Sequence, residues 1–192
     1  VLWDRQAGTI VSNESSEIIR MFNSAFDQLT GNDLDFWPMA MREDIEEINN
    51  DIYQNVNNGV YRSGFATRAD AYEQVVHQLF AALDRLELRL SSNRYLLDDR
   101  LTEADWRLFT TLIRFDAVYV GHFKCNIRRI VDYPALSGYM RELYQMSGIA
   151  DTVNMKHIKY HYYASHLNIN PTGIVPAGPE QDFSAAHGRD HL

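Results

Sequence analysis

The chain has 192 residues, of which 45% are hydrophobic and 12% aromatic, and it carries a formal net charge of −8. This composition is typical of a globular protein with one full hydrophobic core, and it is not that of a disordered chain. The negative charge argues against a general nucleic-acid binder, which needs clustered Lys and Arg side chains facing phosphate. No apolar run approaches the roughly 18 residues that would cross a bilayer, so we expect no membrane partner. We also expect no signal peptide at VLWDRQ and no disulfide framework from the single Cys125, which together predict a cytoplasmic protein.

Residues 1–30 predict a β-hairpin followed by one helix. Val1–Trp3 and Thr9–Val11 are short β-type runs, and the polar turn between them ends in Gly8. Ser12-Asn13 is a typical helix cap, and apolar residues at helical spacing follow it at Ile18, Ile19, Phe22 and Phe26. A hairpin and one helix bury too little apolar surface to form an independent domain.

Residues 31–41 are predicted to be a linker, because the stretch from Thr30 to Pro38 is polar and rich in helix breakers. Residues 42–192 then show helical spacing of apolar side chains. The predicted helices are one from Ile45 ending near Gly59, one from Thr67-x-x-Asp70 through Leu90, one starting at Pro134, and a last one capped by Asp151 and running to about His166. Proline and glycine forbid regular structure beyond Asn168, and we expect residues 182–192 to form a loose tail.

Leu101–Phe123 is the segment around which the rest is organised. Thr102 and Asp105 have the spacing of a capping box, and Leu101 and Trp106 that of a hydrophobic staple. The apolar residues behind this cap lie on more than one helical face, which is typical of a helix buried on most sides. The segment therefore predicts the central helix of a helical domain.

These residues also carry a family resemblance. A capped, buried helix reading Thr-Glu-Ala-Asp-Trp after a long amphipathic helix resembles the core helix of the glutathione transferase C-terminal domain. Asn57–Tyr61, His157–Tyr163 and Asn168–Gly173 narrow the resemblance to the xi class, the glutathionyl-hydroquinone reductases. The implied fold is mainly α: a glutathione transferase C-terminal helical domain preceded by the terminal hairpin and helix of a thioredoxin-like α/β domain.

The resemblance implies a glutathione-dependent reductase that removes glutathione from glutathionyl-hydroquinones. Glutathione is then a co-substrate, an aromatic quinol conjugate the other substrate, and a homodimer through the helical domain the expected assembly. The family's nucleophilic cysteine would lie before Val1, so we expect the 192 residues alone to be inactive. Two alternatives stay open: an ordinary glutathione transferase that conjugates electrophiles, and a non-catalytic interaction module.

Glu14 and Ser15 are the candidate glutathione-binding residues. A serine in the first turn of a helix offers a hydroxyl and an amide beside the positive end of the helix dipole, where a carboxylate binds well, and Glu14 can accept from an ammonium group. Local sequence alone equally allows two ordinary first-turn residues. The resemblance favours recognition of the γ-glutamyl group.

Tyr61, Tyr119 and Tyr162 are the candidate catalytic residues. We place Tyr61 in a loop just beyond the helix end at Gly59, where a tyrosine can exchange a proton once a neighbouring charge shifts its pKa. Among eleven tyrosines, spacing alone would make each a structural residue. The resemblance assigns Tyr61 as proton donor or acceptor to the quinol and Tyr119 and Tyr162 as hydroxyls near the thiolate. Tyr160 and Tyr163 are close competitors of Tyr162.

Two further patterns receive no functional role. His157 and His161 share a helical face, but no carboxylate or thiol lies nearby to complete a zinc site, so no metal is assigned there or at His166. Cys125 has Lys124, Arg128 and Arg129 nearby, which could lower a thiol pKa. It follows the central helix rather than a strand-to-helix turn, so we interpret it as an ordinary thiol.

Overall fold

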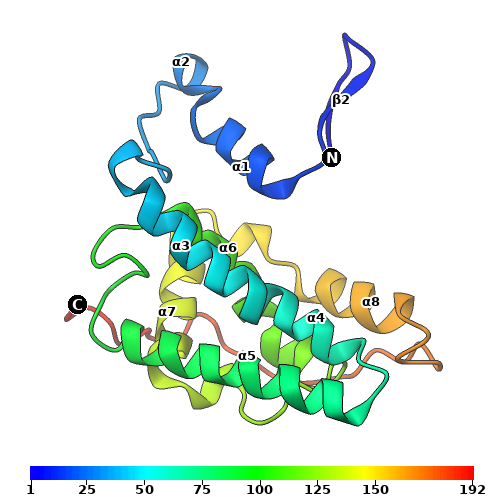
Figure 1. Cartoon of the computed structure of the whole chain (residues 1–192). Coiled ribbons are helices and arrows are strands. Elements are labelled where there is room, and N and C mark those ends of the chain that lie inside the picture. Colours follow the sequence, from blue (N-terminus) through cyan, green and yellow to red (C-terminus); the bar gives the residue numbers. More distant parts are fainter.

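The computed structural model describes residues 1–192 and is largely helical (Figure 1). Its two strands and eight α-helices are β1 (Leu2–Asp4), β2 (Thr9–Ser12), α1 (Ser15–Ser24), α2 (Asp27–Thr30), α3 (Arg42–Ile52), α4 (Asn58–Gly64), α5 (Ala69–Leu90), α6 (Glu103–Arg114), α7 (Pro134–Gln145) and α8 (Met155–Ser165). Short helical turns are η1 (Met39–Met41), η2 (Tyr53–Asn57), η3 (Phe115–Tyr119), η4 (Ile130–Asp132) and η5 (Ala150–Thr152). No helix is both long and apolar enough to cross a membrane.

The N-terminal segment forms the predicted hairpin and helix. β1 and β2 pair antiparallel with Trp3 opposite Ile10, and Gly8 in the turn takes a left-handed φ of +65° that glycine adopts without strain. The cap of α1 lies two residues later than Ser12, at Glu14, whose side chain accepts from the Ser16 amide. Ser12 still supports this turn, because its hydroxyl accepts from the Glu14 amide and donates to Glu17.

One arginine ties this segment to the helical body. Arg20 on α1 makes a bidentate contact with Glu103 at the start of α6, with a shortest distance of 2.8 Å, and it also pairs with Glu46 on α3. Its guanidinium lies 3.6 Å from the ring centre of Trp37. Glu103 is buried, so this ion pair holds the middle of α1 against the start of α6 (Figure 1).

The helix that follows residues 31–41 is longer than predicted. α3 passes without a break into the π-helical turn η2 and then into α4, so the helical run continues from Arg42 to Gly64 instead of ending near Gly59. Tyr61 therefore lies on a helix and not in a loop. The structure also begins α5 at Ala69 with Arg68 at the cap, and Thr67 makes no capping hydrogen bond. Asp70 pairs with Arg68 instead.

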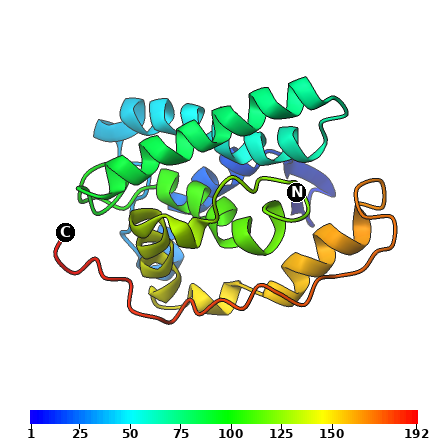
Figure 2. The same cartoon turned by 90° about the horizontal axis from the view of Figure 1, so that it is seen from below.

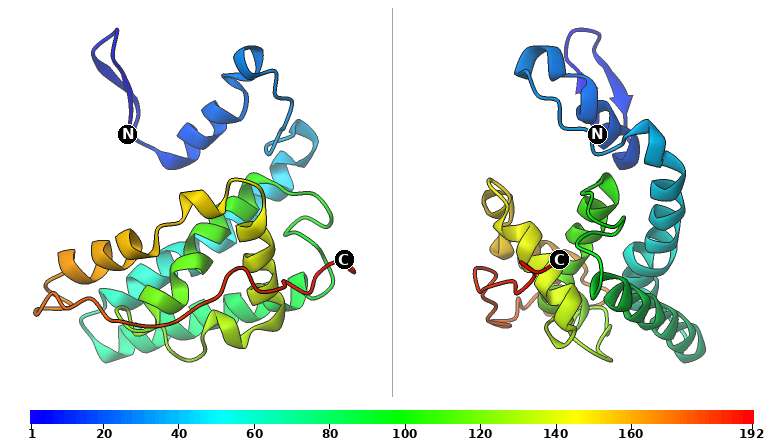
Figure 3. Two further views of the ribbon diagram at one scale, coloured as in Figure 1. Left: turned by 180° about the vertical axis from the view of Figure 1, so that it is seen from behind. Right: turned by 90° about the vertical axis from the view of Figure 1, so that its left-hand side faces the viewer.

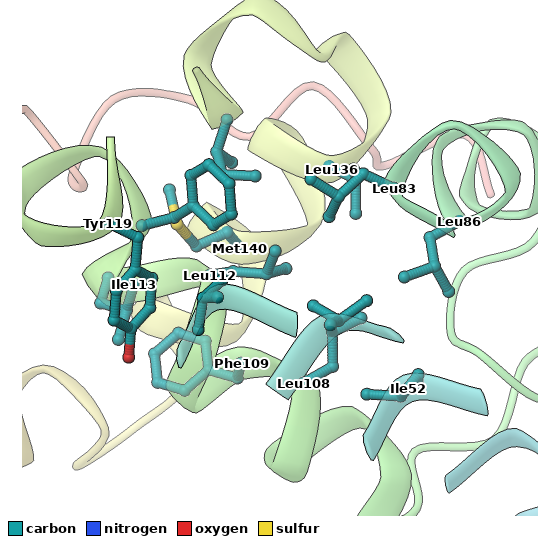
Figure 4. Close-up of a cluster of buried hydrophobic side chains, with 14 of the residues drawn as sticks. Ile52, Leu83, Leu86, Leu108, Phe109, Leu112, Ile113, Tyr119, Leu136 and Met140 are labelled. Carbon is teal, nitrogen blue, oxygen red and sulfur yellow. The ribbon is translucent and has the colours of Figure 1, made fainter. Parts of the chain in front are cut away.

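α6 occupies the centre of the core, as its sequence predicts. The Thr102 amide donates to the Asp105 carboxylate at 2.8 Å, completing a capping box. The fully buried Asp105 also accepts from the Leu96 amide and the Tyr139 hydroxyl, and so links α6 to α7 and to the loop after α5. Beyond Arg114 the helix widens into the π-helical turn η3. Figure 4 shows apolar side chains of this helix, among them Leu108 and Leu112, packed with those of neighbouring elements, and Tyr119 at one edge of the cluster.

The C-terminal part differs from prediction in two places. Asp151 lies in η5, and the cap of α8 is Asn154, whose side chain accepts from the His157 amide. Residues 182–192 are not a loose tail. The chain after α8 runs back along the helices (Figure 2 and Figure 3) and ends beside the last turn of α5. There Arg189 is buried, pairs with Glu142 at 2.9 Å and donates to the Leu90 carbonyl.

Candidate functional site

Three tyrosine hydroxyls from three separate elements form one hydrogen-bonded chain. Tyr162 on α8 lies in the middle, with its hydroxyl oxygen 2.6 Å from that of Tyr61 on α4 and 3.0 Å from that of Tyr119 on η3. Tyr119 and Tyr162 are buried, whereas 38% of Tyr61 is exposed. The chain therefore runs from the core to the surface and ends at Tyr61.

Backbone shape and aromatic packing explain how these rings meet. Tyr119 is the last residue of the π-helical turn η3, a wider turn of the kind that is frequent at functional sites. Phe123 stacks on Tyr119 at a centroid distance of 5.6 Å and also contacts Tyr61 and Tyr162. The two competing tyrosines lie elsewhere. Tyr160 is exposed, and the Tyr163 hydroxyl donates to the Ala117 carbonyl.

The two buried hydroxyls of this hydrogen-bonded chain, those of Tyr119 and Tyr162, have raised pKa values. Burial, followed by the proximity of Tyr162 and Tyr61, raises the pKa of Tyr119 far above its ordinary value. Burial also raises the pKa of Tyr162 to about 12, although a hydrogen bond from Tyr119 opposes the rise. Both hydroxyls are therefore protonated at neutral pH. Tyr119 can donate its hydrogen bond to Tyr162, and Tyr162 can donate to Tyr61.

A cavity of about 320 Å³ opens beside the three tyrosines. It is lined by polar and aromatic side chains, namely Asn57, Asn58, Tyr61, Thr110, Thr111, Arg114, Tyr119 and Tyr162. A second cavity, of about 530 Å³, lies at the start of α1 and includes Glu14 and Ser15 in its wall. Asn57 and Thr110 belong to the walls of both, so the two cavities adjoin between η2 and α6.

The Glu14 end carries groups that are available to a ligand. Glu14 and Ser15 are both exposed at the first turn of α1. The Glu14 carboxylate makes only long contacts, 3.5 Å to the Ser16 amide and 3.3 Å to the Ser16 hydroxyl. The Ser15 hydroxyl makes no hydrogen bond within the chain, and Trp106 and Arg107 of α6 face the same cavity. This arrangement suits a small ligand with both a carboxylate and an ammonium group.

Cys125 is buried in the core and lines neither of the two cavities. Its side chain is fully buried, and the thiol lies 3.7 Å from the Phe123 carbonyl. Burial raises the pKa of the thiol to about 12, an effect larger than the lowering by the Lys124 charge. Arg128 and Arg129 point their charges at Asp84 and Asp132 rather than at the sulfur.

The histidines show one association that the sequence did not suggest. His157 and His161 are exposed, and no group of three or more His, Cys, Asp or Glu side chains is arranged to hold a metal ion. His166 is instead within hydrogen-bond distance of His122, with 3.1 Å between their ring nitrogens, and both rings pack against Tyr162. Burial, together with the charges that His166 and Lys124 can carry, lowers the pKa of His122 to about 4.

Five residues that line the tyrosine cavity received no role in the sequence analysis, namely Asn57, Asn58, Thr110, Thr111 and Arg114. Thr110 and Arg114 are one helical turn apart and share a face of α6 with Arg107, which a helical projection of the predicted central helix could have revealed. Asn57 lies in the Asn57–Tyr61 stretch that carries the family resemblance, but helical spacing does not point to the cavity, because Asn57 is the last residue of the π-helical turn η2.

Comparison with known proteins points to one family. A family model described as "Glutathione S-transferase, C-terminal domain" matches residues 69–142. The glutathionyl-hydroquinone reductase YqjG of Escherichia coli K12 is 57% identical over 190 residues, covering 99% of this chain and 58% of that protein. A solved glutathione-bound structure of YqjG superimposes with a TM-score of 0.97 at 56% identity, over 100% of this chain and 62% of that chain. A xi-class enzyme from Natrialba magadii gives a TM-score of 0.96 at 49% identity, over 99% and 58%. The chain thus spans about three fifths of the length of the relatives it matches.

Proposed function

Because this chain belongs to the glutathione transferase family and matches xi-class members over almost its whole length, we propose that it is the quinol-binding part of a glutathionyl-hydroquinone reductase. In this proposal residues 1–30 complete a thioredoxin-like domain, residues 31–41 link it to the helical domain, and residues 42–192 form that domain. The sulfur nucleophile is a cysteine outside these 192 residues, and the working protein is a cytoplasmic homodimer.

The observation that carries the proposal is the hydroxyl chain, which ends beside a cavity adjoining the one at Glu14 and Ser15. Three hydroxyl groups supply three protons, and two hydrogen bonds between them use two. One proton therefore remains for a ligand atom. Since Tyr61 is the exposed end of the chain, it is the group that exchanges this proton with a bound quinol.

The two cavities divide the substrate between them. Glu14 and Ser15 hold the α-amino and α-carboxylate groups of the glutathionyl moiety, with the dipole of α1 favouring the carboxylate. The quinol ring then extends past Asn57 and Thr110 to the tyrosines. Aromatic walls with a few placed hydroxyls are suited to such a ligand.

The reaction proceeds in two sulfur exchanges. A ring hydroxyl first gives up its proton while the neighbouring sulfur-bearing carbon takes one, so that this carbon becomes tetrahedral and the oxygen a carbonyl; Tyr61 exchanges these protons with the ring. The cysteine thiolate then attacks the sulfur of the conjugate, a disulfide forms, and the carbon–sulfur electron pair passes into the ring to give the phenolate, which takes a proton. A glutathione thiolate then attacks the mixed disulfide. The products are the hydroquinone and oxidised glutathione, so atoms and electrons balance.

Tyr61→Phe in the full-length protein tests this function, with Tyr160→Phe as the matched control on the exposed face of α8. Glutathionyl-menadiol and glutathione are the substrates, and quinol release is measured. We expect Tyr61→Phe to lower kcat by about 100-fold or more, the usual contribution of a positioned proton donor, and Tyr160→Phe to leave it unchanged. Equal turnover by both variants would clear Tyr61 of the role.

The same preparation separates the alternatives. If the wild-type protein conjugates glutathione to an electrophile but releases no quinol, the chain serves an ordinary transferase. Absence of both activities, with the upstream cysteine present, would favour a non-catalytic interaction module.

A further inference from the structure

Arg114 is the one cationic side chain in the wall of the cavity beside the three tyrosines. It is the last residue of α6, directly before the π-helical turn that carries Tyr119, and it is half-buried. No carboxylate lines this cavity, so the charge of Arg114 is not neutralised from within it.

Arg107, two turns earlier on the same helix, shows the contrast. It lines the adjoining cavity near Glu14, but it is paired with Glu103 at 3.4 Å. Arg114 takes part in no ion pair, and its only hydrogen bond is donated to the Thr110 carbonyl of its own helix. A guanidinium has five N–H donors, so most of those of Arg114 have no partner within the chain.

The proposed reaction creates a charge where such a cation would act. When the carbon–sulfur bond of the protonated, tetrahedral ring carbon breaks, its electron pair enters the ring and the negative charge passes to the neighbouring ring oxygen. That oxygen remains anionic until it has recovered its proton. Fixed donors and charges aimed at an oxyanion are among the largest contributions to catalysis.

We propose that Arg114 stabilises the phenolate of the departing quinol, so that quinol release is fastest for rings seated with an oxygen toward it. This inference rests on the proposed function. Tyr61 and Arg114 then have separate tasks, since the tyrosine exchanges the proton and the arginine balances the charge before the proton arrives. An arginine without a carboxylate partner suits this task, because a paired one would already be neutralised.

The charge of Arg114 affects the pKa of one of the three tyrosine hydroxyls. Burial raises the pKa of Tyr162, and the nearby Arg114 cation is among the groups that oppose the rise. Arg114 therefore lies close enough to the hydroxyl chain to favour negative charge there.

The test compares Arg114→Gln, Arg114→Lys and the control Arg62→Gln in the full-length protein. Arg62 is exposed on α4 beside Tyr61 and does not line the cavity, so its substitution removes the same charge. Glutathionyl conjugates of a series of hydroquinones with graded phenol acidity are the substrates. Thermal unfolding of each variant is recorded to compare stability.

We expect Arg114→Gln to lower kcat by about 100-fold, most for the least acidic quinols, so that the dependence of rate on quinol acidity becomes steeper. Arg114→Lys should recover activity to within about tenfold of the wild type because the charge is retained. A purely structural role would lower the rates of all quinols equally and would not be rescued by lysine.

The inference is overturned if Arg114→Gln matches Arg62→Gln, or if its effect does not depend on quinol acidity. Either result leaves the proposed function intact, provided that the wild-type protein releases quinol. Absence of quinol release by the wild type would reject the proposed function and this inference with it.

Discussion

Replacing Gly64 by alanine should both destabilise the protein and disturb the tyrosine site. A Cβ atom at Gly64 would lie 2.1 Å from Cδ1, 2.3 Å from Cγ and 2.8 Å from Cβ of Phe123, where ordinary contacts are 3.4–4 Å. The ring must therefore move by more than 1 Å within a buried site. Because Phe123 packs on Tyr61, Tyr119 and Tyr162, its displacement reaches all three hydroxyls.

Gly59, on the same helix, provides a matched control. Its added Cβ would meet Leu79 at 3.6 Å, an ordinary contact, so Gly59→Ala should gain up to about 1 kcal/mol from helix propensity. At Gly64 the same gain is outweighed by overpacking of about 3 kcal/mol, which leaves a net loss of about 2 kcal/mol. The two variants should then differ by about 3 kcal/mol, or roughly 6–12 °C in Tm for a protein of this size.

Thermal unfolding followed by circular dichroism measures this difference, and quinol release reports the site. We expect Gly64→Ala to melt below the wild type and to turn over more slowly, with Gly59→Ala at or above the wild type in both respects. If Gly64→Ala melts at or above the wild-type temperature, the close packing of Phe123 on α4 is wrong.

Two further predictions concern buried titratable groups. A thiol with its pKa raised from 9.0 to about 12 has about 1,000-fold less thiolate at neutral pH, so Cys125 should resist iodoacetamide in the folded protein and react in urea, as read by peptide mass spectrometry; fast labelling in buffer would contradict its burial. His122 should make stability fall in acid: its pKa of about 4 in the folded state lies below the ordinary 6.5, so the unfolded state binds the proton first and the stabilisation, complete above pH 6.5, is lost as pH drops toward 4. His122→Asn should flatten the dependence of the urea midpoint on pH across this window, whereas the exposed His77→Asn should leave it unchanged; equal slopes for all three proteins would refute the assignment.

The helical architecture could be predicted from local sequence because helices are encoded at short range. The periodicity around Leu79 and Leu112 and the capping box at Thr102 depend on residues three or four apart, which a single helical turn brings together. The hairpin followed the same logic, with a left-handed Gly8 in its turn. Local sequence could not distinguish Tyr162 from Tyr160 and Tyr163 as the candidate site residue, because all three have similar sequence surroundings. Only the family resemblance favours Tyr162.

Contacts between distant residues could not be predicted in this way. Tyr61 and Tyr162 are 101 residues apart, and their hydrogen bond joins α4 to α8 beside the ring of Phe123. The sequence predicts a loose C-terminal tail, because proline and glycine forbid regular structure beyond Asn168 and chain ends are commonly poorly ordered. In the structure the tail is held by the buried ion pair between Arg189 and Glu142, two residues that lie 47 positions apart in the sequence.

The sequence by itself determined that most of the chain is helical, where α6 begins, and that Glu14 and Ser15 stand at the first turn of a helix, since each depends on a few neighbouring residues. Only the tertiary structure decided that three tyrosines share a hydrogen-bonded chain, that Cys125 is sealed in the core, and that Arg114 faces their cavity without a counter-ion. These features depend on burial and on distances between elements, because pKa and charge balance are set by what surrounds a group in space.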